Sequence, residues 1–326
     1  GRRLTPVKGR LTGSVGRDTY KGMNASIGDI DNNGYQDIYV SNVHEKLQAE
    51  GSLLWMNDGR LDQEGAGALE DQAASRNVLN EHRFGWGAAI GDLDRDGRLD
   101  IVQANGMVDN SLDATQGGCP DYWYWNDKIA LTGPDTHGYA DSWADLRGRC
   151  IFPNEKPRVY VNQGRYFVDV ASEVGAGRPG VTRGVALADF DNRGALDVLM
   201  TDQFAPARFY RNSTSAYNWI GLDLKGDGKV CNVDALGTKV VIHGEATAHR
   251  QIREVHAANG LSAQGDRRLF FGLGPLRGDV PVEIEWCGGP VSERLTLAPN
   301  QYHTLRLKNH HAQIPPSAAP VTTSSR

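Results

Sequence analysis

Three copies of one acidic phrase decide the fold of this chain: GDIDNNGYQD at 28–37, GDLDRDGRLD at 91–100 and ADFDNRGALD at 188–197. Each copy follows a small apolar segment and precedes a β-rich run, at 38–40, 101–102 and 198–200. This arrangement predicts a strand, a tight acidic loop and a second strand. Aromatic segments that end in asparagine come next, at 53–57, 159–162 and 209–212. With 166–170 as a fourth strand, the unit matches one antiparallel blade of a β-propeller.

The acidic phrase has the ligand spacing D-x-D-x-[DN]-G-x-x-D. Calcium takes about six to eight oxygen ligands in flexible geometry, and this spacing supplies side-chain oxygens at positions 1, 3, 5 and 9 and a carbonyl at position 7. The glycine at position 6 permits a positive φ, so the chain can curl around an ion. No EF-hand is indicated, because position 12 carries no glutamate. The predicted ligands are Asp29, Asp31, Asn33, the Tyr35 carbonyl and Asp37 in the first loop, and Asp92, Asp94, Asp96, the Arg98 carbonyl and Asp100 in the second.

The third loop departs from this pattern. It offers Asp189, Asp191, the Ala195 carbonyl and Asp197, but it places Arg193 at position 5. Because a guanidinium cannot be a metal ligand, the third site is expected to be weaker, to be completed by water, or to be replaced by an Asp–Arg ion pair. Acidic surface turns without a metal are the alternative for all three loops.

The four cysteines fit two disulfides, Cys119–Cys150 and Cys231–Cys287, each within one candidate domain. Such bonds persist in oxidising compartments and predict an extracellular or periplasmic protein. Four reduced, buried thiols are the alternative. None of the cysteines lies in a C-x-x-C pair, so neither a structural zinc site nor a c-type haem site is indicated.

The composition is that of an ordinary soluble protein, with 326 residues, 39% of them hydrophobic, and a net charge of −5. The sequence has no run of 18 or more apolar residues, so no membrane-spanning helix is predicted. The sequence has no run of basic residues of the kind that indicates nucleic-acid binding. Two sequence patterns, at 24–26 and 212–214, are those of N-glycosylation and bring in a glycan as a candidate partner.

Spacing and composition divide the chain into three parts. Residues 1–215 hold the blades, with an insertion at about 107–156; residues 216–308 form a separate all-β domain; and residues 309–326, rich in proline, alanine and serine, form a tail that is flexible or docked on a partner. Strands of the second domain are expected at 219–224, 239–243, 250–255, 268–271, 282–286 and 302–307. The insertion carries the aromatic cluster Tyr122, Trp123, Tyr124 and Trp125, which either binds a sugar or a protein partner or packs as the core of its own loop.

These motifs resemble two known families. Residues 23–212, with the sequence FGWG at 84–87, resemble the FG-GAP/VCBS repeats of calcium-binding β-propellers. Residues 218–307 look like the ASPIC/UnbV domain of cartilage-acidic-protein-like and bacterial UnbV-like proteins. The residues that carry this likeness are NWI at 218–220, ALGTKV at 235–240, REV at 253–255, LFFGLG at 269–274 and VEIEW at 282–286. The resemblance implies extracellular or periplasmic binding and adhesion and no shared catalysis.

The chain departs from the family in the number of blades. Three blades are clear, with one more strand at about 10–19, whereas the family implies a closed ring of about seven. Another chain or a longer precursor is expected to supply the rest. The sequence therefore predicts a calcium-binding, non-catalytic scaffold subunit whose partners are other protein chains. The alternatives are a hydrolase-like enzyme with its site in the insertion or on the propeller axis, and an accessory subunit of a redox or photosynthetic complex.

Overall fold

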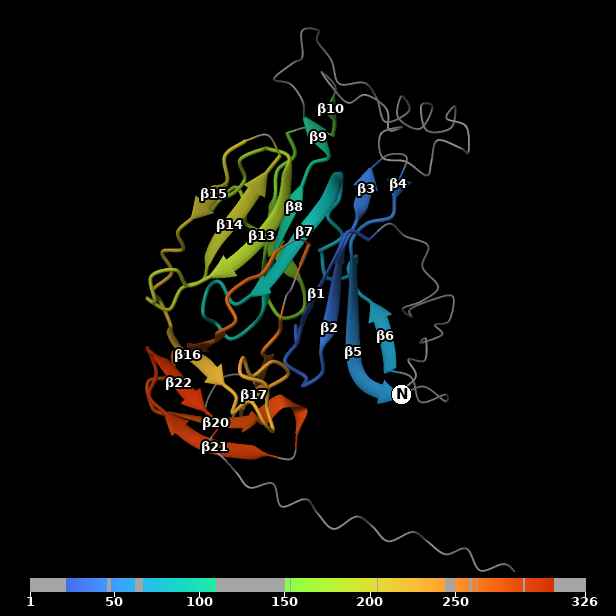
Figure 1. Cartoon of the computed structure of the whole chain (residues 1–326). Helices are drawn as coiled ribbons and strands as arrows, with labels where there is room; N and C mark the ends of the chain where they lie inside the picture. The colour runs from blue at the N-terminus through green and yellow to red at the C-terminus, as the bar shows by residue number, and fades with distance from the viewer. Residues whose placement is uncertain are drawn as a thin grey trace, which may run out of the picture.

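Strands form nearly all of the regular structure in this computed structural model (Figure 1). The structure describes residues 22–45, 48–61, 67–109, 150–152, 154–203, 205–243, 250–257, 260–261, 263–289 and 291–307. In these ranges no helix is long and apolar enough to cross a membrane. The predicted tail, the strand at 10–19 and most of the insertion, with Tyr122–Trp125, lie outside the described residues.

The first blade is an antiparallel sheet in the order β1-β2-β5-β6. Its strands are β1 (Asn24–Gly28), β2 (Asp37–Ser41), β5 (Leu53–Leu61) and β6 (Gly67–Asp71). Burial alternates along β1 and β2, as expected for strands that pack on one face. An unpredicted hairpin, β3 (Val43–Glu45) and β4 (Gln48–Ala49), leaves this blade and pairs with the next one.

The second blade contains β7 (Arg83–Gly91), β8 (Asp100–Asn105), β11 (Arg158–Asn162) and β12 (Phe167–Asp169). With the hairpin they form one six-stranded sheet in the order β12-β11-β8-β7-β3-β4. Two short strands, β9 (Val108–Asp109) and β10 (Cys150–Ile151), pair where the insertion leaves and rejoins the blade. The third blade, as far as it is described, has three strands, β13 (Thr182–Ala188), β14 (Asp197–Asp202) and β15 (Arg208–Tyr210).

Apolar side chains between neighbouring sheets hold the blades together. The first strands of the three blades lie side by side, with β7 packed between β1 and β13. Tyr39, Ile101 and Phe167 are buried together between the first two blades. Val185 and Met200 are buried between the second and third blades, in a cluster that Trp219 of the following domain joins.

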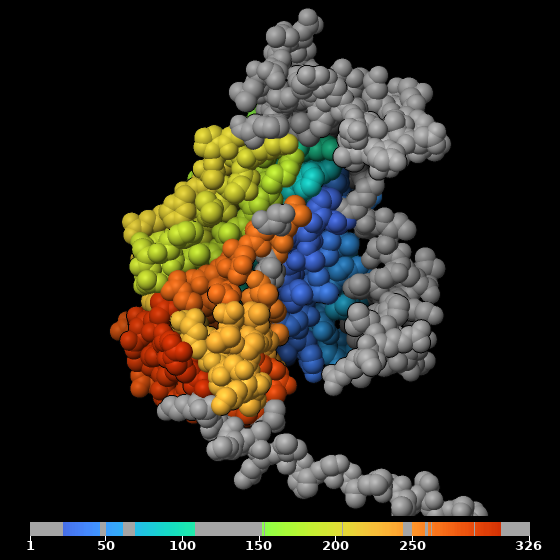
Figure 2. All heavy atoms as spheres, in the orientation of Figure 1, coloured from blue at the N-terminus to red at the C-terminus, as the bar shows by residue number. Residues whose placement is uncertain are grey.

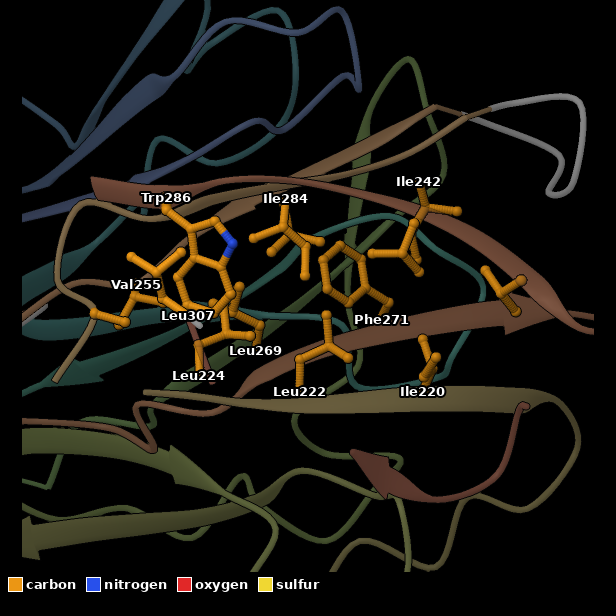
Figure 3. Packing of buried hydrophobic residues seen from close by; sticks show 14 of the residues in the cluster. Ile220, Leu222, Leu224, Ile242, Val255, Leu269, Phe271, Ile284, Trp286 and Leu307 are labelled. Atoms are coloured by element: carbon orange, nitrogen blue, oxygen red, sulfur yellow. The ribbon is translucent and has the colours of Figure 1, made fainter. Parts of the chain in front are cut away.

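Residues 218–307 form two further sheets, which we call the C-terminal domain. One sheet has the order β19-β16-β22 and the other β18-β17-β20-β21. The strands are β16 (Asn218–Lys225), β17 (Lys239–Ile242), β18 (Gln251–Glu254), β19 (Leu269–Gly274), β20 (Val280–Glu285), β21 (Ser292–Leu297) and β22 (Tyr302–Arg306). Trp286, Phe271 and Leu222 lie in the apolar core between the sheets (Figure 3). The predicted all-β architecture of propeller blades followed by a small β domain is thus confirmed.

A disulfide joins Cys231 to Cys287, two residues 56 positions apart in the sequence. It connects the loop before β17 to the turn after β20. On the chain-entropy model a loop of this size stabilises the fold by about 4 kcal/mol. The other predicted pair, Cys119–Cys150, lies outside the described residues because Cys119 is not among them.

Candidate metal centres

The three acidic loops occupy the same place in the three blades. Each joins the first strand of a blade to the second, from β1 to β2, from β7 to β8 and from β13 to β14. The glycine at position 6 has a φ of 104° at Gly34, 92° at Gly97 and 79° at Gly194. A side chain there would be strained, so glycine is what allows each turn to close. All three loops lie at the end of the blades that faces the C-terminal domain (Figure 1).

The first loop folds around two buried carboxylates. Asp29 accepts hydrogen bonds from the amides of Asn33 and Gly34, both at 3.0 Å. Asp37 accepts hydrogen bonds from Ile30 N and Asn57 N, both at 2.7 Å. The backbone thus gathers the side chains of positions 1 and 9, which are nearly inaccessible to solvent.

The second loop repeats this arrangement with one difference. Asp100 accepts from Leu93 N and Asn162 N, each at 2.8 Å. Oδ2 of Asp92 accepts two amide hydrogen bonds, from Gly97 at 2.9 Å and from Gly272 of the C-terminal domain at 3.0 Å. Oδ1 of Asp92 is buried and has no hydrogen-bond partner among the described residues. A buried carboxylate oxygen without a partner is costly, and a bound cation would satisfy it.

Burial dominates the electrostatics of the first two loops. It raises the pKa of Asp37 and Asp92 to about 7 and the pKa of Asp29 and Asp96 to about 6. Burial also raises the pKa of Asp100 well above its ordinary value, and the neighbouring Asp92 and Asp94 raise this pKa further. Asp96 forms an ion pair with Arg98 of its own loop, and Arg253 acts on Asp29 and Asp92, but burial outweighs these cations.

In the third loop an arginine occupies the centre. Nε of Arg193 lies 2.8 Å from Oδ1 of Asp191, and Nη2 forms an ion pair with Asp197. The carboxylates at positions 3 and 9 are therefore bridged by a guanidinium from position 5. This geometry agrees with the ion-pair alternative among the three predicted for this loop.

The donor sets fit calcium in the first two loops. In all three loops the carboxylates of positions 1, 3 and 9 place one oxygen each within 4.8 Å of one another, but in the third loop Arg193 already pairs with two of them. One ion with oxygen distances of about 2.3–2.6 Å can satisfy that separation. All the predicted ligands are oxygens, the type that calcium and magnesium prefer over zinc. The predicted roles of Asp94, Asp96 and Asn33, and of the Tyr35, Arg98 and Ala195 carbonyls, stay predictions.

The asparagines that end the aromatic strands connect neighbouring blades. Nδ2 of Asn162 donates to Leu99 O of its own loop at 3.1 Å and to Ile30 O of the previous loop at 3.0 Å. Asn212 repeats this toward Leu196 O at 3.1 Å and Leu93 O at 2.7 Å. Asn57, the equivalent residue of the first blade, makes the bond within its blade, to Gln36 O. Its bond to a preceding blade is not found among the described residues.

Residues of the C-terminal domain complete the surroundings of the loops, and sequence reasoning missed all of them. Arg253 on β18 lies between the first and second loops, and Gly272 on β19 contacts Asp92. The hydroxyl of Tyr302 donates to Oδ2 of Asp189 in the third loop at 2.9 Å. Figure 2 shows the orange segment of this domain reaching between the blue first blade and the yellow-green third blade. The residues in these contacts are more than 100 positions apart in the sequence, so no local sequence pattern predicts the contacts.

The two glycosylation patterns fall on asparagines that the fold uses internally. Asn24 is 5% exposed, and its Nδ2 donates to Ser26 Oγ at 3.0 Å. Nδ2 of Asn212 is the inter-blade donor described above. A glycan replaces one of the two amide hydrogens, so at Asn212 it would break one of the two bonds, and at Asn24 it would have to attach to a buried nitrogen. The glycan prediction is therefore not supported at either position.

Part of the chain matches a known protein family, and most of it is similar to curated relatives. Residues 228–312 match the family model described as ASPIC and UnbV. Over 293 residues the chain is 25% identical to cartilage acidic protein 1 of Mus musculus, a match that covers 84% of this chain and 43% of the relative. The Homo sapiens protein of that name is also 25% identical, with 84% and 42% covered.

A third relative, cartilage acidic protein 1 of Xenopus tropicalis, is 24% identical over 309 residues, which cover 88% of this chain and 45% of the relative. The chain thus spans less than half the length of the curated relatives it matches. The predicted resemblance to ASPIC/UnbV proteins is confirmed. The FG-GAP/VCBS repeats stay a prediction.

Proposed function

We propose that this chain, whose residues 228–312 match the ASPIC and UnbV family model, is an extracytoplasmic calcium-binding scaffold that assembles with other propeller blades. The division into blades up to about residue 215 and a separate β domain from about 216 to 308 is part of the proposal. The disulfide between Cys231 and Cys287 supports an oxidising compartment, extracellular or periplasmic.

The unpartnered Oδ1 of Asp92 carries the calcium part of the proposal. It is buried, it belongs to a group of three close carboxylates, and it sits in a loop with a repeated oxygen-ligand spacing. Asp29, Asp31 and Asp37 offer an equivalent group in the first loop. A bound divalent cation would supply the positive charge that these carboxylates lack.

Calcium titration of the full chain is expected to find two ions per chain, one in each of the first two loops. Arg193→Asn restores the ligand pattern of the first loop at position 5 of the third loop, and it removes the cation that bridges Asp191 and Asp197. Isothermal calorimetry on this variant is therefore expected to find three ions.

The matched control is Arg211→Gln, because Arg211 also pairs with Asp191, at 2.7 Å, but is exposed and lies outside the loop. It should keep two ions. Three ions on the unaltered chain, or two on Arg193→Asn, would contradict the assignment of the third loop. No heat of binding in any variant would contradict calcium binding altogether.

The scaffold part of the proposal is supported by an apolar face on the third blade. Ala186, Leu199 and Phe209 are cross-strand neighbours on that face. Phe209 is 50% exposed and Phe190 is 56% exposed, and their rings pack edge to face at 5.1 Å. Equivalent faces between the described blades are buried, so this one has the chemistry of a blade that lacks its neighbour. Asn57 of the first blade has no inter-blade partner among the described residues, which gives the same indication at the other end of the row of blades.

A photo-crosslinking phenylalanine analogue at position 209 tests this in the native source. It is expected to join the chain to other propeller blades when the assembly is isolated in calcium. The same analogue at position 233, which is exposed on the C-terminal domain, serves as the control. Equal crosslinking from both positions, or a chain isolated as an uncrosslinked monomer, would be evidence against a completed propeller.

A further inference from the structure

Arg253 is a buried cation that the C-terminal domain places against the metal loops. It belongs to β18, and the residue is 9% exposed. Its Nη1 donates to Ile252 O at 2.9 Å, whereas Nη2 makes long bonds to Gly97 O of the second loop at 3.5 Å and to Gln251 Oε1 at 3.4 Å. Nε is buried and has no partner among the described residues. The guanidinium carbon also lies 5.4 Å from the centroid of the Phe271 ring on β19 of the same domain. Its own domain therefore packs against Arg253 but leaves its hydrogen bonding incomplete.

The charges that attract Arg253 come from two different loops. Asp29 belongs to the first loop, and Asp92, Asp96 and Asp100 belong to the second. None of them forms a direct ion pair with the guanidinium in the described part of the chain. Arg253 therefore acts on several carboxylates over a distance and occupies none of their oxygens, and Oδ1 of Asp92 keeps no partner among the described residues.

The docking of the domain fixes this position. Gly272 N donates to Asp92, and Gly274 N donates to Arg95 O at 3.0 Å. A Cβ on Gly272 would lie 2.2 Å from Asp92 Oδ2 and 2.4 Å from the Arg95 backbone, so only glycine permits the approach. Gln251 Nε2 donates to Gly272 O at 2.7 Å and ties β18 to β19 behind the contact.

The third loop shows the same solution built within a single loop. There Arg193 bridges Asp191 and Asp197 directly, and the loop has its cation in its own sequence. The first two loops have no arginine at position 5. Arg98 at position 7 of the second loop forms an ion pair with Asp96. The cation that acts on both Asp29 and Asp92 is instead Arg253, which lies more than 150 positions further along the chain.

We propose that Arg253 is a resident counterion of the first two loops, a positioning residue through which the C-terminal domain stabilises the metal-free loops and lowers their affinity for calcium. The inference rests on the proposed calcium binding. Its sign follows from charge: a divalent cation that enters beside a buried guanidinium is repelled by it, and solvent screens that repulsion poorly in a buried site. By reciprocity, calcium weakens the electrostatic attachment of Arg253 by the same factor.

Calcium calorimetry and melting curves on the full chain test the proposal with Arg253→Gln. The variant is expected to bind calcium about tenfold more tightly, since one neighbouring charge commonly shifts an ionic equilibrium by about that factor or more. Its melting temperature without calcium should fall, and the increase in melting temperature on adding calcium should be larger than for the unaltered chain.

Two further variants act as controls. Arg253→Lys keeps the charge and should stay close to the unaltered affinity. Arg294→Gln makes the same kind of change at an exposed site of the same domain, where the arginine contacts Glu283 at 3.2 Å. It should leave calcium binding unchanged.

An unchanged or weaker calcium affinity of Arg253→Gln overturns the proposal, and so does an equal loss of melting temperature with and without calcium, which indicates packing alone. If Arg253→Gln folds neither with nor without calcium, the double variant Arg253→Gln, Asp29→Asn is measured. Removing one carboxylate together with the guanidinium restores the charge balance and should restore folding. Failure of this double variant to fold also overturns it. Absence of calcium binding to the unaltered chain refutes the proposed function itself, whereas normal binding with no effect of Arg253→Gln refutes this inference alone.

Discussion

Chelation with EDTA is expected to lower the melting temperature of the calcium-loaded chain by about 10–20 °C. A ligand that binds the folded state at 100 times its Kd stabilises it by about 2.7 kcal/mol, so two sites contribute about 5 kcal/mol. In a domain of about 150–250 residues each kcal/mol corresponds to about 2–4 °C. Scanning calorimetry in calcium and in EDTA measures the difference.

The size of this effect depends on where the ions bind. Asp29, Asp37 and Asp92 are each 1% exposed or less, so bulk solvent compensates poorly for a lost cation. The loops also carry the bonds between blades, because Asn162 donates to Ile30 O and Asn212 to Leu93 O. Loss of the ions should therefore loosen the contacts between blades together with the loops.

Asp92→Asn is the matched variant for this experiment. The asparagine can still accept the amides of Gly97 and Gly272, but it cannot supply an anionic oxygen at the unpartnered Oδ1 position. About half of the EDTA effect should remain, from the first loop. Identical melting curves with and without EDTA on the unaltered chain would refute calcium stabilisation.

The sequence contains the parts of the fold that repeat locally. The acidic phrase, its glycine and the strand that ends in asparagine recur three times, which was sufficient to predict the blades and the candidate ligands. Strand β21 was missed because its residues are exposed or half-buried and it has no hydrophobic run. The hairpin β3–β4 was missed because its partner, β7, belongs to another blade.

The surroundings of the loops were beyond sequence reasoning for a different reason. Arg253 lies in the segment REV at 253–255, which the resemblance used only as a family signature. Nothing in that segment shows that the guanidinium faces Asp92 and Asp29. Gly272 lies in a strand whose sequence is otherwise apolar, and its role depends on the approach of Arg95 and Asp92. Contacts between the blades and the C-terminal domain depend on how the two pack together, which the sequence of either part does not specify.

Acidity should stabilise the metal-free chain, contrary to the usual behaviour of carboxylates. Burial raises the pKa of Asp37 and Asp92 from 3.8 to about 7. A raised folded-state pKa means that the native state holds more protons than the unfolded state between these values. Its contribution is therefore complete below about pH 4 and is lost as the pH rises through 7.

From pH 5 to pH 8 in EDTA the free energy of unfolding is expected to fall by at least about 5 kcal/mol, since Asp37 and Asp92 each titrate over about two pH units at about 1.4 kcal/mol per unit. The raised pKa values of Asp29, Asp96 and Asp100 add to this fall. Urea unfolding across this range measures the fall, and Asp92→Asn should reduce it by about 2–3 kcal/mol, the share of one group. In saturating calcium the sign should reverse, because protons compete with the ion for the same oxygens. A metal-free stability that stays constant or rises toward pH 8 would show that these carboxylates are ionised without a metal, and that the loops need no cation.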